Sequence, residues 1–143
     1  MKFRPYNLFL DDVRFLDECS YMNDPRYMTR NWIIARSYDE FVSILQQKWE
    51  QGLFPELVSF DHDLADEHYL ESMMKDLEEY NRISNNFQEK TGNDAAKFLV
   101  QFCIDRMLDL PECLVHTMNP VGRNNIKNSL LEWKRYQEKI TKR

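Results

Sequence analysis

The chain has 143 residues, of which 43% are hydrophobic and 13% aromatic. This length and composition predict one folded domain over residues 1–143 and exclude wholesale disorder. The net charge of −5 provides no global basic field, so we expect no duplex DNA binding. No apolar run approaches membrane-spanning length, so we expect no membrane partner.

Cysteine usage indicates a reducing environment. The three cysteines, Cys19, Cys103 and Cys113, are odd in number and have no CxxC spacing. This pattern argues against a disulfide framework or a zinc knuckle. We therefore expect a cytoplasmic protein.

The first predicted strand, Tyr6–Leu10, is apolar and stops abruptly at Asp11 and Asp12. Asp is a poor strand former, and adjacent carboxylates repel each other unless a cation or a proton holds them. Residues 15–31 are polar and rich in turn formers. They predict a loop-rich crossover with at most a short helix.

The next segment, Trp32–Arg36, predicts a second short strand. Ser37 and Glu40 then match a capping box, in which the two side chains satisfy free helix N–H groups. The helix that follows has apolar residues at helical spacing. These are Phe41, Ile44, Leu45 and Trp49.

Gly52 and Pro55 end this helix and lead into a third strand, Leu57–Phe60, which is followed by Asp61. Residues 64–90 are rich in acidic side chains, yet apolar residues still recur there at helical spacing. We therefore expect an inserted helical hairpin or lid. A charged, solvated face with no further role is the alternative.

Thr91 and Asp94 form a second capping-box match at the start of another helix. Residues 113–115 predict a fourth short strand. The Asn119–Pro120 pair is a good N-cap and first-turn combination. A last helix should therefore run from this pair to about residue 139.

Alternation of short strands and helices predicts parallel strands joined by right-handed crossovers. We therefore predict an α/β, three-layer, receiver-like fold. Its short, mainly parallel four-stranded sheet is flanked by helices and carries a helical insertion around residues 64–90. In open sheets of this kind, ligands bind outside the carboxyl ends of the strands.

Carboxylates follow two of the predicted strands. Asp11 and Asp12 come after the first strand and Asp61 after the third, so all three should meet at one edge of the sheet. Hard oxygen ligands suit Mg²⁺ or Mn²⁺. We predict a divalent metal held by these aspartates. The alternative is that one caps a loop while the others are solvated.

Histidines follow two strands as well. His62 comes after the third strand and His116 after the fourth. If those strands are neighbours, both imidazoles flank a common ligand, and histidine is the natural acid or base near neutral pH. We predict His62, His116 and Asp61 as catalytic residues. A packing role for either histidine is the alternative.

Phosphate-binding residues are predicted beside them. Arg14 and Arg36 lie just past the first and second strands, and guanidinium groups pair in a bidentate manner with phosphate oxygens. Thr117, Asn119 and the start of the last helix add hydroxyl, amide and backbone N–H donors. Either arginine could instead only neutralise the aspartates. The combined set describes a site for a phosphate ester.

Four motifs, LFLDDVR, SFDHDL, TGNDAA and VHTMNPVG, occur in this order. They resemble those of the cyclic-phosphate processing receiver-like domain, a small family of bacteria and phages associated with RNA repair or nucleotide signalling. The resemblance covers nearly the whole chain. It implies a receiver-type fold, a cyclic-phosphate substrate and, in a phage protein, the host cytoplasm. In this likeness Asp11, Asp12 and Asp61 correspond to the acidic pocket of receivers.

The same likeness makes His62, Asp63, His116 and Asn119 the family's additions to that pocket. The chain departs from the family at Thr117, where serine is usual, and in its large acidic insert. Thr117 keeps the hydroxyl group. The departures therefore concern substrate size and access more than the chemistry.

These patterns predict a phosphoesterase that hydrolyses or processes a cyclic nucleotide or an RNA 2′,3′-cyclic phosphate end. A divalent metal would polarise the ester, and the two histidines would exchange protons with it. One alternative is a signalling receiver that accepts phosphate on Asp61, although the sequence offers neither a fifth strand nor a suitable lysine. The others are a non-catalytic binder, such as a phage accessory protein, and a scaffold that acts through the acidic insert.

Overall fold

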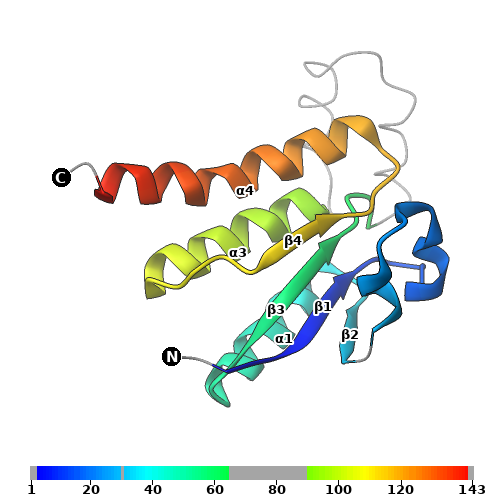
Figure 1. Cartoon of the computed structure of the whole chain (residues 1–143), viewed down its shortest axis with the longest axis horizontal. Coiled ribbons are helices and arrows are strands. Elements are labelled where there is room, and N and C mark those ends of the chain that lie inside the picture. The colour runs from blue at the N-terminus through cyan, green and yellow to red at the C-terminus, as the bar shows by residue number, and fades with distance from the viewer. Residues whose placement is uncertain (1–2, 30, 65–89, 142–143) are drawn as a thin grey trace.

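The computed structural model describes residues 3–29, 31–64 and 90–141. It contains a four-stranded, all-parallel sheet in the order β2-β1-β3-β4 (Figure 1). The strands are β1 (Phe3–Leu10), β2 (Trp32–Ala35), β3 (Leu53–Phe60) and β4 (Glu112–Val115). The predicted α/β, receiver-like fold class is confirmed.

Three α-helices and two 3₁₀ helices are described around the sheet. They are η1 (Leu16–Met22), η2 (Pro25–Met28), α1 (Tyr38–Glu50), α3 (Gly92–Arg106) and α4 (Pro120–Thr141). The helical insertion predicted around residues 64–90 falls almost wholly outside the described residues. No described helix is long and apolar enough to cross a membrane.

The two faces of the sheet pack against different layers. Leu8, Leu10 and Phe60 are fully buried on the face that meets the α-helices. Phe9 points to the opposite face, where it packs with Cys19 and Tyr27 of the η1–η2 segment. Because side chains alternate along a strand, the pleat separates these two clusters. The 3₁₀ helices form the second covering layer, where the sequence predicted a loop with at most one short helix.

Local capping signals place two helices as predicted. The Thr91 hydroxyl accepts the N–H of Asp94, and the Asp94 carboxylate accepts the N–H of Thr91, so this capping box is complete. At α1, the Ser37 hydroxyl accepts the N–H of Glu40, but the Glu40 carboxylate accepts the N–H of Arg36 instead of Ser37. The predicted capping box of Ser37 and Glu40 is therefore only half formed.

The start of β3 differs from the prediction. Pro55 cannot donate to a sheet ladder, so the sequence placed the start of this strand at Leu57, whereas β3 begins at Leu53. The register between β1 and β3 shifts on both sides of the Tyr6–Pro55 pair. This irregularity lets the strand carry a proline, because proline is tolerated where the ladder is interrupted.

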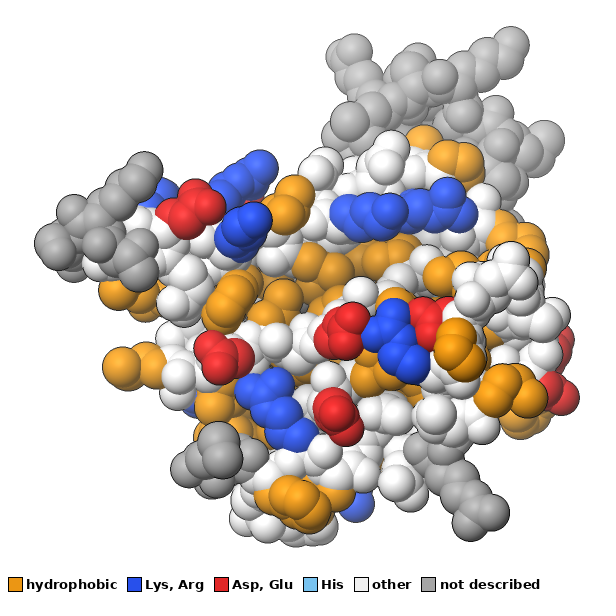
Figure 2. Space-filling model, viewed as in Figure 1, with side chains coloured by type: hydrophobic (Ala, Val, Ile, Leu, Met, Phe, Trp, Pro, Cys, Tyr) orange, Lys and Arg blue, Asp and Glu red, His pale blue; other side chains and the backbone are white. Residues whose placement is uncertain are grey.

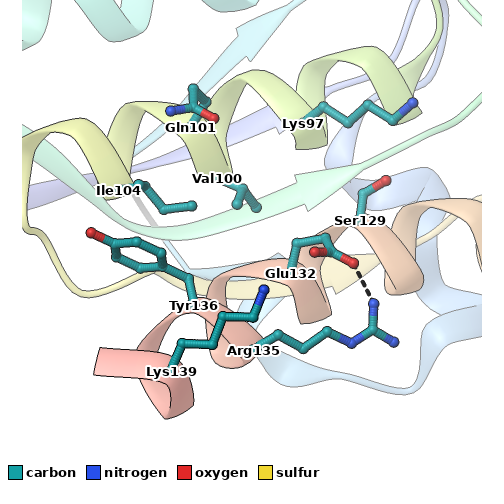
Figure 3. Close-up of a pocket in the computed structure, with 9 residues that line it drawn as sticks. All are labelled: Lys97, Val100, Gln101, Ile104, Ser129, Glu132, Arg135, Tyr136 and Lys139. Carbon is teal, nitrogen blue, oxygen red and sulfur yellow. Dashed lines mark hydrogen bonds and ion pairs between the residues drawn. The ribbon is translucent and has the colours of Figure 1, made fainter. Parts of the chain in front are cut away.

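Helices α3 and α4 leave a groove of about 410 Å³ between their outer edges. Figure 3 shows Val100 and Ile104 of α3 between the two helices. The charged residues Lys97, Arg135 and Lys139 also line the groove. On the face drawn in Figure 2, Lys and Arg side chains gather over α4. None of the predicted site residues is among those that line this groove.

Candidate active site

The carboxyl ends of the strands bring the predicted residues to one edge of the sheet (Figure 1). The ladder continues one residue past each strand end. The N–H of Asp11 donates to the Ala35 carbonyl, that of Asp61 to Leu10, and that of His116 to Phe60, at 3.1, 2.9 and 3.0 Å. These bonds fix the three backbones side by side, so that their side chains converge in one buried polar cluster, which is called the pocket below.

Asp11 is fully buried at the centre of this pocket. Its Oδ1 accepts the N–H groups of Val13 and Arg14, at 3.0 and 2.8 Å. Its Oδ2 lies 3.0 Å from Nε2 of His116. Burial alone would raise the pKa of Asp11, but the hydrogen bonds from His116 and from the Arg14 and Val13 backbone lower it below its ordinary value. Asp11 is therefore a permanent carboxylate at neutral pH.

His116 is also fully buried, and protein groups contact both of its ring nitrogens. Nδ1 lies 2.7 Å from Oγ of Ser59, and Ser59 Oγ lies 2.6 Å from the Tyr27 hydroxyl. The ring stacks on Phe9 with a centroid distance of 4.6 Å. Burial lowers the pKa of His116, although the hydrogen bond to Asp11 acts in the opposite direction.

Asp11, at one end of this hydrogen-bonded chain, determines which ring nitrogen of His116 carries the proton. A carboxylate only accepts, so Nε2–H of His116 donates to Asp11 and Nδ1 of the neutral ring accepts from Ser59. Tyr27 then donates to Ser59. Binding of a metal through Nε2 would require the opposite tautomer, in which Nε2 has lost its proton and Nδ1–H donates to Ser59.

Asp61 is 2% exposed and completes the pocket. Its Oδ1 accepts the N–H of His62 at 2.9 Å. Burial, followed by the negative charges of Asp11 and Asp63, raises the pKa of Asp61 to about 7, although Arg14 and a hydrogen bond from Thr117 act against this rise. Two buried carboxylates with opposite pKa shifts mark a place where a proton or a cation is favoured.

Among the residues that the structure describes, one set of three side chains offers ligand atoms close enough to hold a metal ion: Asp11, Asp61 and His116, within 4.8 Å of one another. It differs from the predicted trio, since His116 takes the place of Asp12. Asp12 is partly exposed beside the pocket. Its role as a ligand stays a prediction.

Arg14 lies at the mouth of this set. Its Nη1 is 3.4 Å from Oδ2 of Asp11 and 3.9 Å from Oδ1 of Asp61. Arg36 is placed differently. Its Nη1 donates to the backbone carbonyls of Asp11 and Arg14, at 3.1 and 2.6 Å, so it holds the turn after β1.

His62 is fully buried beside the pocket, with its Nδ1 3.1 Å from Oδ1 of Asp63. Two glycines allow the backbone to pass this close. A Cβ on Gly122 would lie 2.4 Å from Cγ of His62, and a Cβ on Gly92 would lie 1.7 Å from the Asp61 carbonyl oxygen. Any larger side chain at either glycine would therefore displace the site.

Asn119 and Thr117 connect α4 to the pocket. The Asn119 side-chain oxygen accepts the N–H groups of Val121 and Gly122, which is the N-cap that the sequence predicted. Its Nδ2 donates to Asp63 at 3.3 Å. Thr117 is buried, and its hydroxyl accepts the N–H of Asn119 at 3.2 Å.

Three contributors were missed by the sequence reasoning: Ser59, Tyr27 and Tyr21. Ser59 carries a faint signal, because it is a polar residue inside an apolar strand. Burial raises the pKa of Tyr21 to about 12, so its hydroxyl keeps its proton and donates to the backbone carbonyl of His116. Tyr21 and Tyr27 lie in a segment without periodicity, and no local pattern points to them.

The sheet order and the buried carboxylates after β1 and β3 define a receiver-type α/β domain. Among protein families, the model of the cyclic-phosphate processing receiver domain matches residues 6–132. The chain therefore belongs to this family, whose description ties it to cyclic-phosphate processing. Neither the curated proteins nor the solved structures contain a significant match.

Proposed function

We propose that the chain is a phosphoesterase that hydrolyses a cyclic phosphate, carried either by a cyclic nucleotide or by the 2′,3′-cyclic end of an RNA. The observation that carries the proposal is the meeting of Asp11, Asp61 and His116 within 4.8 Å. Family membership supplies the substrate class. The buried carboxylates and the adjacent guanidinium supply the chemistry.

The three side chains suit a divalent cation such as Mg²⁺ or Mn²⁺. The two carboxylate oxygens are hard donors that suit either ion, and the imidazole nitrogen, a softer donor, favours Mn²⁺ over Mg²⁺. The raised pKa of Asp61, about 7, is the mark of a buried negative charge that lacks sufficient compensation. When bound, the cation would act as a Lewis acid on a phosphoryl oxygen.

Arg14 is the phosphate-binding side chain that the geometry supports best. It reaches between Asp11 and Asp61 and retains a side chain that is 24% exposed, so it can meet a ligand from the solvent side. A positioned guanidinium stabilises the charge that develops on the phosphoryl oxygens. Arg36, bonded to two carbonyls, supports the turn that presents Arg14.

Hydrolysis of the ring needs two proton transfers. The oxygen of water forms a bond to phosphorus and gives up a proton, while the bond from phosphorus to one sugar oxygen breaks and that oxygen gains a proton. We assign one of these transfers to His62. His116 takes the other only in a form of the site in which the two aspartates alone hold the cation, because both of its ring nitrogens are otherwise engaged. Asp63 orients His62, and Asp11 with Ser59 orients His116, as carboxylates do for catalytic histidines.

The test is a panel of cyclic mono-, di- and oligonucleotides and cyclic-phosphate-ended RNA, followed by ³¹P NMR in the presence of Mg²⁺ or Mn²⁺. We expect the strained cyclic ester signal to be replaced by that of a monoester for at least one member. If folded protein leaves every member intact, the enzyme proposal fails.

A second candidate is a non-catalytic receiver-like module for signalling or a phage accessory role. It is favoured by one observation: protein groups contact both ring nitrogens of His116. Such a module would bind phosphate or accept it on Asp61. Incubation with acetyl phosphate and measurement of the intact mass distinguishes it, because a stable phosphoryl adduct on Asp61 would support this candidate over hydrolysis.

A further inference from the structure

Large apolar side chains are exposed in the segments that follow β1 and β4, close in sequence to Asp11 and His116. Val13, Phe15 and Tyr21 follow β1 and are 63%, 55% and 39% exposed, and Met118 follows β4 and is 59% exposed. Single exposed apolar residues are ordinary, but a group of them beside a polar pocket points to a ligand. The two aromatic rings of this group carry the inference.

The Phe15 ring is held by a fixed arginine. The guanidinium carbon of Arg36 lies 4.6 Å from the ring centroid. The same guanidinium donates to the carbonyls of Asp11 and Arg14, so it cannot swing away without losing two hydrogen bonds. One side of Phe15 is therefore covered by a cation that belongs to the turn after β1, while more than half of the residue remains open to solvent.

Tyr21 is held in a similar way. The Arg14 guanidinium lies 5.8 Å from its ring centroid, and its hydroxyl donates to the backbone carbonyl of His116. The ring is thus tied to the pocket at its polar end and keeps an exposed apolar body. Both arginines connect these rings to Asp11, the central carboxylate of the pocket.

We propose that Phe15 and Tyr21 form a stacking platform for the nucleobase of the substrate, with its phosphate at Asp11, Asp61 and Arg14. The proposal rests on the proposed function and names its substrate as a nucleotide. A flat ring that is fixed from behind loses little freedom when a base stacks on it. Stacking accepts every base, because each has a π face. A cation behind the ring adds attraction of its own.

The test compares base-bearing with base-less ligands in protein that contains Mg²⁺. Turnover of uridine and adenosine 2′,3′-cyclic phosphates is measured against ribose 2′,3′-cyclic phosphate. Binding of uridine and adenosine 3′-monophosphates is measured by calorimetry, which needs no turnover. We expect Phe15→Leu and Tyr21→Leu each to weaken nucleotide binding about tenfold, and to reduce the preference for base-bearing esters.

Matched controls are available in the same chain. Phe3 is 68% exposed at the opposite end of β1, so Phe3→Leu removes an equivalent ring far from the pocket and should change nothing. Tyr21→Phe keeps the ring but loses the hydroxyl that ties it to the His116 carbonyl, and should weaken nucleotide binding less than Tyr21→Leu does. Both controls separate stacking from general effects on the fold.

The outcomes distinguish this inference from the proposed function. If cyclic phosphates are hydrolysed equally well with and without a base, and the two leucine variants behave like wild type, the platform is wrong and the phosphoesterase stands. If no cyclic phosphate is hydrolysed but monophosphate binding still depends on Phe15 and Tyr21, the platform stands and the phosphoesterase is wrong. Monophosphate binding that neither leucine variant weakens would overturn the platform.

Discussion

The Nε2 atom of His116 lies 3.0 Å from Oδ2 of Asp11, across 105 positions of the chain. The contact joins the ends of β1 and β4, which do not pair with each other, because β3 lies between them in the sheet. The relative positions of Asp11 and His116 therefore depend on the pairing of β1, β3 and β4. A chain that reaches from Asp11 through His116 and Ser59 to Tyr27 then connects the pocket to the layer of 3₁₀ helices.

The first prediction concerns that chain of hydrogen bonds. Tyr27→Phe removes the hydroxyl that contacts Ser59 and should destabilise the fold by about 1–2 kcal/mol, because a buried partner loses its bond. It should also shift the ring ¹⁵N resonances of His116, whose tautomer depends on Ser59. Urea unfolding and a long-range ¹H–¹⁵N spectrum measure the two effects.

Tyr6 is the matched control for Tyr27. It is 5% exposed, and within the described part of the chain its hydroxyl has no hydrogen-bond partner. Tyr6→Phe should therefore be neutral or stabilising, since it removes an unsatisfied buried group. Equal losses of stability in the two variants would contradict the assigned chain.

The second prediction is a pH dependence of stability due to Asp61. Its pKa is raised from 3.8 to about 7 in the fold, so the folded state favours the protonated form. The folded protein is thus favoured at low pH, and that contribution is lost as the pH rises through about 7. In metal-free protein, Asp61→Asn should stabilise the fold at about pH 8 by an amount on the order of 2–4 kcal/mol.

The gain from Asp61→Asn should shrink towards zero near about pH 3, where the wild-type carboxyl is protonated in the fold and largely protonated in the unfolded chain. Urea unfolding at both pH values, with a chelator present, makes the comparison. Asp109→Asn replaces an exposed carboxylate and serves as the control. A stabilisation by Asp61→Asn that does not vary with pH would refute the assigned cause.

Local sequence signals were sufficient to predict where several helices begin and where two of the strands end. The Thr91–Asp94 capping box and the Asn119–Pro120 start of α4 depend on neighbours within one helical turn, and both appear in the structure. The abrupt ends of the first and third strands likewise marked where Asp11 and Asp61 lie. Parallel strand order then placed these carboxylates at one edge.

Contacts between distant residues could not be predicted in this way. Ser59 meets His116 across 57 positions and Tyr27 across 32, and nothing in the spacing of an isolated serine or tyrosine specifies such partners. Arg36 shows the same limit. Its position after β2 suggested a phosphate ligand, whereas its guanidinium bonds to carbonyls of the neighbouring turn, which only the tertiary structure brings within reach.

The third prediction reverses an ordinary rule for glycine in helices. Gly→Ala within a helix usually stabilises by about 0.5–1 kcal/mol. At Gly122 the new methyl group would lie 2.4 Å from Cγ of His62, so Gly122→Ala should instead destabilise the fold by about 2 kcal/mol or more. Thermal unfolding of the variant tests this.

Gly52→Ala is the contrasting variant. Gly52 has φ of +82°, and a Cβ there would meet nothing within 4 Å. Its cost should come from backbone conformation alone, about 1 kcal/mol. A Gly122→Ala variant that is more stable than wild type would show that His62 does not pack against α4 as described.

The fourth prediction separates the two arginines. Arg14→Lys keeps the positive charge but loses the planar fork, so hydrolysis should fall by about ten- to hundredfold with little change in stability. Arg36→Lys loses hydrogen bonds to two carbonyls and should lower the free energy of unfolding by about 1–2 kcal/mol. Initial rates and urea unfolding of both variants give the comparison. If Arg14→Lys lowered mainly the stability and Arg36→Lys mainly the rate of hydrolysis, the roles assigned to the two arginines would be wrong.

The most direct measurement is a calorimetric titration of metal-free protein with Mn²⁺ at about pH 8, where Asp61 is ionised. If Asp11, Asp61 and His116 hold one divalent cation, wild type should bind one equivalent, Asp61→Asn should lose most of that affinity, and Asp109→Asn should keep it. Isotherms of wild type and Asp61→Asn that coincide would contradict a metal site in this pocket.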